Sequence, residues 1–227
     1  MDQIQKNRIS IQVSLSGYSF KCGSEGSMQS SGWLEPGSVF TTPELQRRYD
    51  EVGISLFTPK CTLVPDAFYD PSEVRAMLSE VVPLRQADKV DSVPVPEFGA
   101  VLLYSNSIDE SLSRVISQTV LTTSGESAPV YPELYYILKD LPSCPEYNKI
   151  LASYRDGTLH LAVAQGKTLQ LANVYKAVDF TTAEYFLFMA VKKLQMNPEV
   201  SSVFFRSPLA ESEEMSLYRY FKAVEKL

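Results

Sequence analysis

The sequence predicts an α/β protein made of two similar lobes. Segments in which apolar and polar residues alternate, separated by tight turns, predict antiparallel strands. Apolar residues at helical spacing behind capping residues predict helices between those strands. These signals recur in the same order in both halves of the 227-residue chain, so we expect lobes at residues 1–124 and 125–227. A Ser-, Gly- and Pro-rich stretch within residues 117–129 predicts the boundary.

The first lobe is predicted to open with a three-stranded meander. Residues 9–15 alternate apolar and polar side chains, and Ser16-Gly17 predicts a turn. Residues 18–22 continue with the same period of two, which indicates a second strand. A third strand is expected near residues 29–34, after another glycine-containing turn.

Helices and further strands complete the first lobe. Thr41 and Glu44 match the T-x-x-E capping box, which predicts a helix from residue 42. Asp70 followed by a proline predicts the start of a second helix, because Asp is a favoured cap and proline suits the first turn. The other elements expected in this half are a strand within residues 54–64, a loop at 86–98, a buried strand at 100–104 and a short helix capped by Ser107 and Glu110.

The second lobe shows the same kinds of signal. Asp156-Gly157 predicts a two-residue hairpin turn, because both positions of that turn favour φ > 0. Thr181 and Glu184 repeat the capping box ahead of an apolar helix. The elements expected are a helix from residue 132, strands at 150–154, 159–163 and 168–174, a helix at 182–194, a strand at 201–205 and a last helix at 211–222.

The two halves match at a shift of 140 residues, which predicts an internal duplication. The matched features are the turns at Gly17 and Gly157, the capping boxes at 41–44 and 181–184, and the strands at 61–64 and 201–204. Coincidence is the alternative, because the second strand is out of phase and Phe20 falls on His160. A slip of one residue would turn the other face of that strand inward.

Composition and charge exclude several classes of protein. The chain carries 21 basic and 27 acidic residues, for a net charge of −6, with no basic patch that would indicate nucleic acid or an anionic membrane as a partner. The longest apolar run, residues 185–191, is far shorter than the roughly 20 residues that span a bilayer. The polar N-terminus lacks the apolar core of a signal peptide. Cys22, Cys61 and Cys144 are far apart, as is typical of reduced thiols. We therefore expect a cytoplasmic protein that binds neither nucleic acid nor membrane.

Four short stretches carry a resemblance to a known family. They are residues 9–20 (ISIQVSLSGYSF), 169–175 (LQLANVY), 180–186 (FTTAEYF) and 194–198 (LQMNP). As a set they resemble a Bacteroidetes family of unknown function with an actin-like ATPase (ribonuclease H-like) fold, over nearly the whole chain. A duplicated strand-strand-strand-helix-strand-helix unit is also the plan of the actin, sugar kinase and heat-shock chaperone superfamily. The resemblance implies that fold and implies no activity.

The same resemblance points to two hairpins as candidate phosphate-binding sites. Proteins of that superfamily cradle the phosphates of ATP with one hairpin per lobe and hold Mg²⁺ indirectly through an Asp in each. The corresponding residues here are Ser16, Gly17 and Ser19 in the first hairpin and Asp156, Gly157 and Thr158 in the second. In the first hairpin a serine stands at the expected Asp position, and we expect Tyr18 to crowd a phosphate. We therefore predict vestigial hairpins with no cofactor and no metal.

Other chemistry has weaker signals. His160 is the only histidine, so a Ser-His-Asp set or a His-ligated metal site would have to use it, and its mid-strand position favours a structural role. We therefore predict no catalytic residue. The helix expected at 182–194 is apolar around its circumference, so Phe186 and Phe188 must pack in the interior or face a partner. The sequence thus favours a non-catalytic interaction or regulatory protein with an unknown protein partner. The alternative is a nucleotide-binding protein or ATPase that binds Mg-ATP between its lobes.

Overall fold

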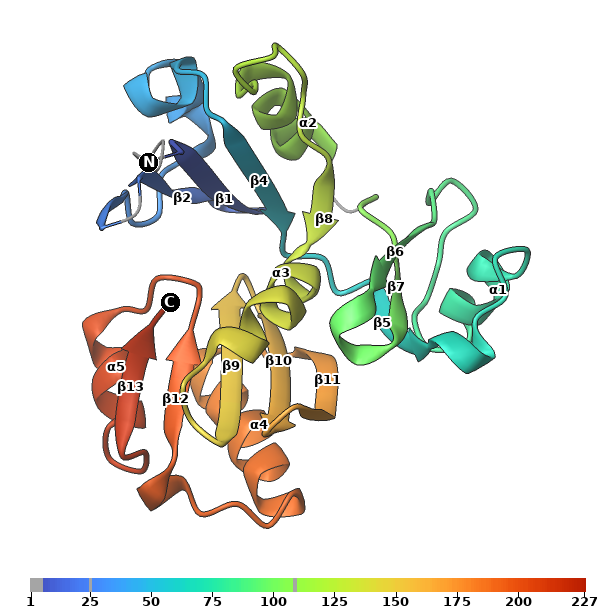
Figure 1. Cartoon of the computed structure of the whole chain (residues 1–227), viewed down its shortest axis with the longest axis vertical. Coiled ribbons are helices and arrows are strands. Elements are labelled where there is room, and N and C mark those ends of the chain that lie inside the picture. The colour runs from blue at the N-terminus through green and yellow to red at the C-terminus, as the bar shows by residue number, and fades with distance from the viewer. Residues whose placement is uncertain (1–5, 25, 108–109) are drawn as a thin grey trace, which may run out of the picture. The chain divides into compact units, whose positions relative to one another are not determined.

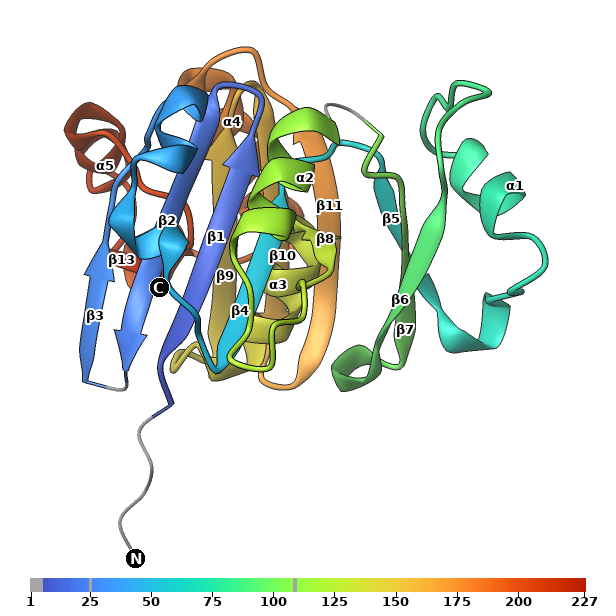
Figure 2. The same cartoon turned by 90° about the horizontal axis from the view of Figure 1, so that it is seen from above.

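The computed structural model describes residues 6–24, 26–107 and 110–227 (Figure 1 and Figure 2). Its internal contacts divide the chain into two compact units, each made of two segments. Unit 1 comprises Met1–Phe57 and Asn106–Tyr131, and unit 2 comprises Thr58–Ser105 and Pro132–Leu227. The boundary that we expected between residues 124 and 125 does not coincide with this division, in which residues 58–105 group with the C-terminal segment.

Unit 1 is built on a five-stranded mixed sheet. Its elements are β1 (Arg8–Ser14), β2 (Gly17–Ser24), β3 (Ser27–Ser30), η1 (Pro36–Phe40), η2 (Pro43–Gln46), β4 (Glu51–Leu56), α2 (Glu110–Thr119) and β8 (Val130–Pro132). The strand order is β3-β2-β1-β4-β8, with an antiparallel meander of β1 to β3 and with β4 parallel to β1. Ile11, Phe20 and Ile54 pack with Ile116 of α2, so this helix covers one face of the sheet.

Unit 2 contains a second five-stranded mixed sheet. Its elements are α3 (Glu133–Asp140), η5 (Leu141–Ser143), β9 (Asn148–Arg155), β10 (Thr158–Gln165), β11 (Thr168–Lys176), α4 (Phe180–Lys193), η6 (Pro198–Val200), β12 (Ser202–Phe205), α5 (Glu211–Leu217) and β13 (Ala223–Lys226). The strand order is β11-β10-β9-β12-β13. Leu187 of α4 and Leu217 of α5 pack against Leu161 and Phe205 on one face. Helix α3 lies on the other face, which carries Ser153 (Figure 1).

Residues 58–105, the inserted segment, form a small antiparallel sheet of their own. Its elements are β5 (Cys61–Pro65), η3 (Asp66–Phe68), α1 (Val74–Ser79), β6 (Asp91–Val95), η4 (Pro96–Phe98) and β7 (Ala100–Tyr104). The strand order is β5-β7-β6 (Figure 2). Leu78 of α1 packs on Val101 and Leu103, and these are the three buried members of a small core.

The two five-stranded sheets have equivalent strand orders, as the predicted internal duplication requires, but the strand pairing gives a different register. Ile11 pairs with Phe20 in the first hairpin, and Ala152 pairs with Leu161 in the second. The second pair lies 141 positions after the first, so the shift of 140 is wrong by one residue in the hairpin. The turn at residues 15–16 corresponds to the turn at residues 156–157, one residue later than a shift of 140 would place it. Phe20 therefore corresponds to buried Leu161 and not to His160. At a shift of 141 residues, the core-facing residues of the second strand coincide in the two hairpins.

The strand that follows each meander is also matched differently from our expectation. Ile54 of β4 lies beside Ile11 in parallel, and Phe205 of β12 lies beside Ala152 in the same way. The counterpart of β12 is therefore β4, and the match of residues 61–64 with 201–204 is wrong. The inserted segment follows β4, so an ungapped comparison cannot align both the hairpins and this strand.

Several local expectations also differ from the structure. Residues 43–46 form only a 3₁₀ turn without a side-chain cap, so the helix predicted from Thr41 and Glu44 is absent from this described stretch. Helix α4 is capped two residues earlier than predicted, because the Asp179 carboxylate accepts from the Thr182 N–H at 2.7 Å. The loop expected at 86–98 contains β6, and the last helix ends at residue 217 before a strand that we did not predict, β13. The predicted cap of α2 by Ser107 and Glu110 spans positions 108 and 109, which lie outside the described residues, and the side chain of Glu110 is not described either.

Candidate functional site

The first candidate hairpin connects β1 and β2 through a turn at Leu15 and Ser16. Gly17, which follows this turn, has φ = 151°, and a Cβ atom at this position would lie 2.0 Å from the Leu34 carbonyl oxygen. The close approach is part of the sheet, because the Tyr18 N–H donates to that carbonyl at 3.0 Å. The backbone alone therefore requires glycine at position 17.

The two side chains that follow Gly17 point to opposite faces of the sheet. Tyr18 is fully buried in the core of unit 1, and its hydroxyl lies 2.7 Å from Thr42 Oγ1. The expectation that Tyr18 crowds a phosphate is therefore wrong, because the side chain points away from the turn. Ser19 lies on the other face, where its hydroxyl donates to Gln12 Oε1 at 3.3 Å.

The second candidate hairpin has the backbone that its sequence predicts. Asp156 and Gly157 have φ values of 47° and 73°, as a two-residue turn of type I′ requires. The Asp156 carboxylate lies 3.5 Å from Nε of Arg155, and Thr158 begins β10 as a buried residue. Asp156, Gly157 and Thr158 are thus brought together in unit 2, while Ser16, Gly17 and Ser19 belong to unit 1.

A buried ion-pair network lies beneath α3 in unit 2. Arg206, directly after β12, donates through Nη1 to Glu133 Oε1 at 2.6 Å and through Nε to Asp140 Oδ2 at 2.7 Å. The Ser153 hydroxyl donates to the same Glu133 oxygen at 2.7 Å, and the guanidinium lies over the Tyr136 ring, 5.3 Å from its centroid. Glu133 is fully buried, and the Arg206 side chain is 9% exposed. Burial alone would lower the pKa of Arg206, but the two carboxylates outweigh it and raise that pKa.

His160 is a buried structural residue in the same unit. Its Nε2 lies 3.0 Å from the Thr58 carbonyl oxygen at the start of the inserted segment. A carbonyl can only accept, so Nε2 carries the proton. Burial lowers the pKa of His160 to about 4, against the smaller opposing effects of Glu133 and of the Thr58 hydrogen bond. The imidazole is therefore neutral near pH 7.

The polar faces of the two sheets are built from equivalent positions. At the shift of 141 residues, Gln12 corresponds to Ser153 and Ser19 corresponds to His160. Arg206 continues β12 on this face. The sequence alone gave no sign of the network, because Glu133 and Arg206 are 73 residues apart and neither stands in a recognised motif.

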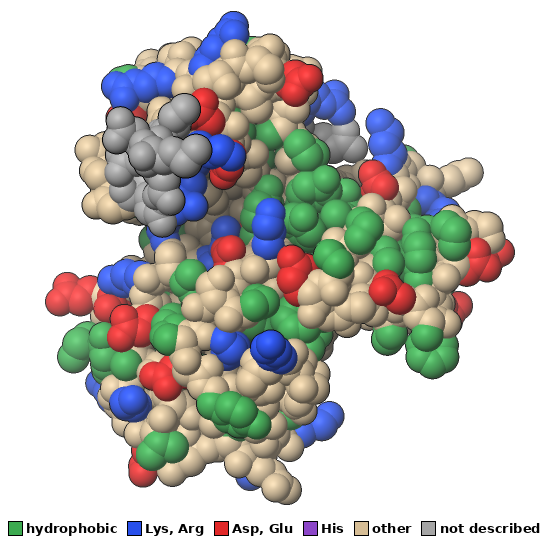
Figure 3. Space-filling model, viewed as in Figure 1, with side chains coloured by type: hydrophobic (Ala, Val, Ile, Leu, Met, Phe, Trp, Pro, Cys, Tyr) green, Lys and Arg blue, Asp and Glu red, His purple; other side chains and the backbone are tan. Residues whose placement is uncertain are grey.

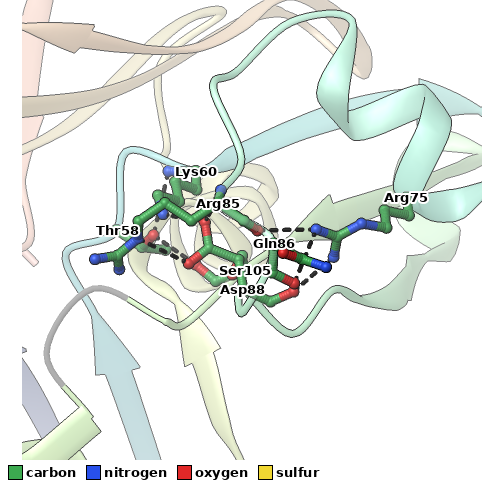
Figure 4. A network of polar contacts seen from close by, with 7 residues as sticks. All are labelled: Thr58, Lys60, Arg75, Arg85, Gln86, Asp88 and Ser105. Carbon is green, nitrogen blue, oxygen red and sulfur yellow. Dashed lines mark hydrogen bonds and ion pairs between the residues drawn. The ribbon is translucent and has the colours of Figure 1, made fainter.

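A second polar network stabilises the inserted segment (Figure 4). Lys60 and Arg85 both pair with the carboxylate of Asp88, which also accepts from the Arg85 N–H at 2.9 Å. Arg75 of α1 donates to the carbonyl oxygens of Asp88 and Arg85 at 2.6 and 2.8 Å. The hydrogen bond from Lys60 is the main cause that lowers the pKa of Asp88 to about 2, so the carboxylate stays ionised. These contacts hold the loop after α1 against β5.

The aromatic residues Phe186 and Phe188 of α4 both pack against other rings of unit 2. Phe186 stacks on Tyr175 of β11 with ring centroids 4.7 Å apart. Phe188 packs against Tyr220 at 4.9 Å and Phe221 at 5.5 Å. Both rings are partly buried against the core of unit 2, and they lie at its edge.

The comparisons with known proteins define the family and the fold. A family model described as "Protein of unknown function (DUF3822)" matches residues 1–224. The chain belongs to this family. A Bacteroides thetaiotaomicron protein of unknown function with an actin-like ATPase fold is similar over 98% of this chain and 91% of its own, at 17% identity and a TM-score of 0.67. A chain of the PilM-PilN type IV pilus biogenesis complex is similar over 97% and 88%, at 11% identity and a TM-score of 0.52. No curated protein matches this sequence.

The DUF3822 chain therefore has the α/β actin-like ATPase fold that the sequence predicted. Identities this low show the fold and carry no activity. Among the described residues, no group of three or more His, Cys, Asp or Glu side chains could hold a metal ion. The described helices also include none that is both long and apolar enough to cross a bilayer.

Proposed function

We propose that this DUF3822 protein is a non-catalytic interaction or regulatory protein that uses an actin-like fold without ATP chemistry. One observation supports this most directly. Arg206 binds both carboxylates of the ion-pair network that we describe on the polar face of unit 2, Glu133 and Asp140. Phosphoryl transfer needs acidic or phosphate oxygens that are free to hold Mg²⁺, and a guanidinium in this place opposes a metal ion.

The polar face of unit 1 supports the same proposal. Among its described residues, Gln12, Ser14, Ser19 and Ser55 are buried and carry amide or hydroxyl groups. We assign the expected Asp position of the first hairpin to Ser14, which ends β1 and whose hydroxyl donates to the Gly17 carbonyl at 3.3 Å. A neutral hydroxyl in this place cannot supply the charge that a carboxylate gives to a hydrated magnesium ion.

A role in protein binding is supported by the surface of unit 2 and by one relative. Tyr185 and Tyr220 are 63% and 50% exposed, and exposed aromatic side chains are typical of protein interfaces. The PilM-PilN structure is a complex between proteins in which one chain has a similar fold. We infer that the DUF3822 chain likewise acts by binding another protein.

Thermal unfolding with increasing Mg-ATP tests the proposal. A ligand present at 100 times its Kd stabilises a folded protein by about 2.7 kcal/mol, which is a readily measured shift in Tm. We expect no saturable shift with Mg-ATP or Mg-ADP, while an active actin-like ATPase in the same assay should show one. A saturable increase in Tm would remove the proposal as stated.

Nucleotide binding is the second candidate, and two observations favour it. Asp156-Gly157-Thr158 forms a tight turn with an acidic side chain, and Tyr18 leaves the first hairpin unobstructed. Under this candidate, the phosphates would contact Ser16, Gly17 and Ser19 of unit 1. Asp156→Asn should then abolish a stabilisation by Mg-ATP that the native protein shows. If the native protein shows none, this candidate fails.

A further inference from the structure

Helix α4 carries a second apolar stripe on the side that is turned away from the core. Ala183, Leu187, Ala190 and Val191 form the inner stripe and are buried. Tyr185, Phe188, Met189 and Lys192 are spaced i, i+3, i+4 and i+7 from one another, so they share another face of the helix. Tyr185 is 63% exposed and Met189 is 38% exposed. Phe188 packs partly against the core, but burial in the core does not account for Tyr185 and Met189.

The chain after α5 extends the stripe into a wider surface. Tyr220 is half exposed and packs edge-on against Phe188, which in turn stacks on the buried ring of Phe221. The Lys222 N–H donates to the Pro198 carbonyl at 3.3 Å, so the same turn also contacts η6. We call Tyr185, Phe188, Met189, Lys192 and Tyr220 the α4 surface. Its aromatic rings are held by their neighbours, so little conformational entropy remains to be lost on binding.

The α4 surface lies among basic side chains in an acidic protein. Residues 184–200 and 218–222 contain four cations, Lys192, Lys193, Arg219 and Lys222, and two carboxylates, Glu184 and Glu199, whereas the whole chain has a net charge of −6. Lys222 lies 3.7 Å from Glu146. Within the described parts of the chain, no carboxylate lies within ion-pair distance of Lys192, Lys193 or Arg219. The charge of these three cations is therefore available to an incoming anionic group.

We propose that the α4 surface binds an acidic, apolar segment of a partner protein. The aromatic rings would contact the apolar side chains of the segment, and Lys192, Lys193 and Arg219 would contact its carboxylates. This inference rests on the proposed function as an interaction protein and names the surface and the chemistry of the partner. An anionic membrane fits less well, because the net charge of −6 on the whole protein repels a surface that is itself negative.

A displayed library of random peptides, selected on the whole protein, tests the proposal without knowledge of the natural partner. We expect the selected peptides to be rich in Asp and Glu interleaved with apolar residues. Their affinity should fall as salt is raised, because the exposed charges are then screened. Tyr185→Ala and Lys192→Glu should each weaken binding by about tenfold or more, which is the range for central interface residues.

Two matched variants control for loss of an aromatic group and for reversal of charge. Phe68 in the inserted segment is 76% exposed, and Lys139 of α3 is exposed on the opposite face of the sheet from α4. Phe68→Ala and Lys139→Glu should leave peptide affinity within about twofold of the native protein, because neither residue belongs to the α4 surface. Circular dichroism would show that all four variants are folded.

The possible outcomes separate failure of this inference from failure of the proposed function. Peptides that are not acidic, or whose binding is unaffected by Tyr185→Ala and Lys192→Glu, would overturn the α4 surface and leave a protein-binding role elsewhere on the chain. Absence of any selected peptide would overturn the inference as well. Binding to vesicles of phosphatidylserine and phosphatidylcholine that depends on Lys192 would replace the protein segment with a membrane. Saturable stabilisation by Mg-ATP would instead refute the proposed function itself.

Discussion

Replacement of Arg206 by methionine should strongly destabilise unit 2. The guanidinium lies 2.6 Å from the fully buried carboxylate of Glu133, and its own side chain is 9% exposed. Arg206→Met keeps the apolar stem and removes the charge, so it leaves the Glu133 carboxylate in the interior without its counter-ion. Removing one partner of a buried ion pair costs about 3–5 kcal/mol, and we expect a loss in this range.

Changes of the partner residues divide this effect into its parts. The Asp140 side chain is 37% exposed, so its ion pair with Arg206 is weakened by solvent, and Asp140→Asn should cost only about 0.5–1 kcal/mol. The double variant Glu133→Leu, Arg206→Met removes both buried charges. It should recover about 2 kcal/mol or more of the stability that Arg206→Met loses, because no isolated charge is left in the interior.

Urea unfolding followed by far-ultraviolet circular dichroism measures these differences. The native protein and the three variants should be compared at one pH and one salt concentration. If Arg206→Met unfolds with a free energy within about 1 kcal/mol of the native value, the Glu133 carboxylate is not buried as described, since isolated buried charges cost more than this. If the double variant is no more stable than Arg206→Met alone, the two residues are not coupled.

Three further predictions concern pH, backbone geometry and the inserted segment. The pKa of His160 is lowered to about 4 from an ordinary value near 6.5, so the unfolded chain binds a proton before the folded protein does as the pH falls. About 3 kcal/mol of the stability present above pH 6.5 should therefore be lost by pH 4. Urea unfolding at a series of pH values measures this loss, and His160→Gln should make the stability depend less on pH. Gly17→Ala should cost about 3 kcal/mol or more because its Cβ would overlap a main-chain carbonyl, whereas Gly157→Ala, with its nearest contact at 3.5 Å, should cost about 1 kcal/mol; equal losses on thermal unfolding would contradict the description of the first hairpin. Asp88→Asn removes the anion that Lys60 pairs with and should speed proteolytic cleavage within residues 80–90, and an unchanged cleavage map from mass spectrometry would show that the network does not hold this loop.

The hairpins were predictable from sequence because their signals are local. The Asp156-Gly157 turn fixes the second hairpin through backbone conformation alone. The helix predicted at Thr41 and Glu44 failed because a capping pattern permits a helix without enforcing one. Strand β6 was not predicted because Pro94 is more typical of a loop. However, β6 is an edge strand of its sheet, where the N–H that proline lacks is not needed for pairing.

The candidate site was predictable only in part. The six hairpin residues followed from the resemblance, and whether they contact a phosphate stays a prediction. The network of Glu133 and Arg206 could not be found, because it depends on the fold bringing α3 close to a residue that lies 73 positions later in the chain. The sequence likewise did not show which residues of β10 lie on the polar face of the sheet. The pairing of Ala152 with Leu161 shows the one-residue offset that places His160 there.

Isothermal titration calorimetry of the whole protein with Mg-ATP tests most directly the claim that the polar faces of the two sheets no longer support nucleotide chemistry. With Arg206 occupying both carboxylates of the unit 2 network and Ser14 in place of an acidic residue, we predict no saturable heat at nucleotide concentrations up to about 1 mM, the upper end of enzyme KM values. A saturable, magnesium-dependent isotherm that disappears in Asp156→Asn would contradict the claim.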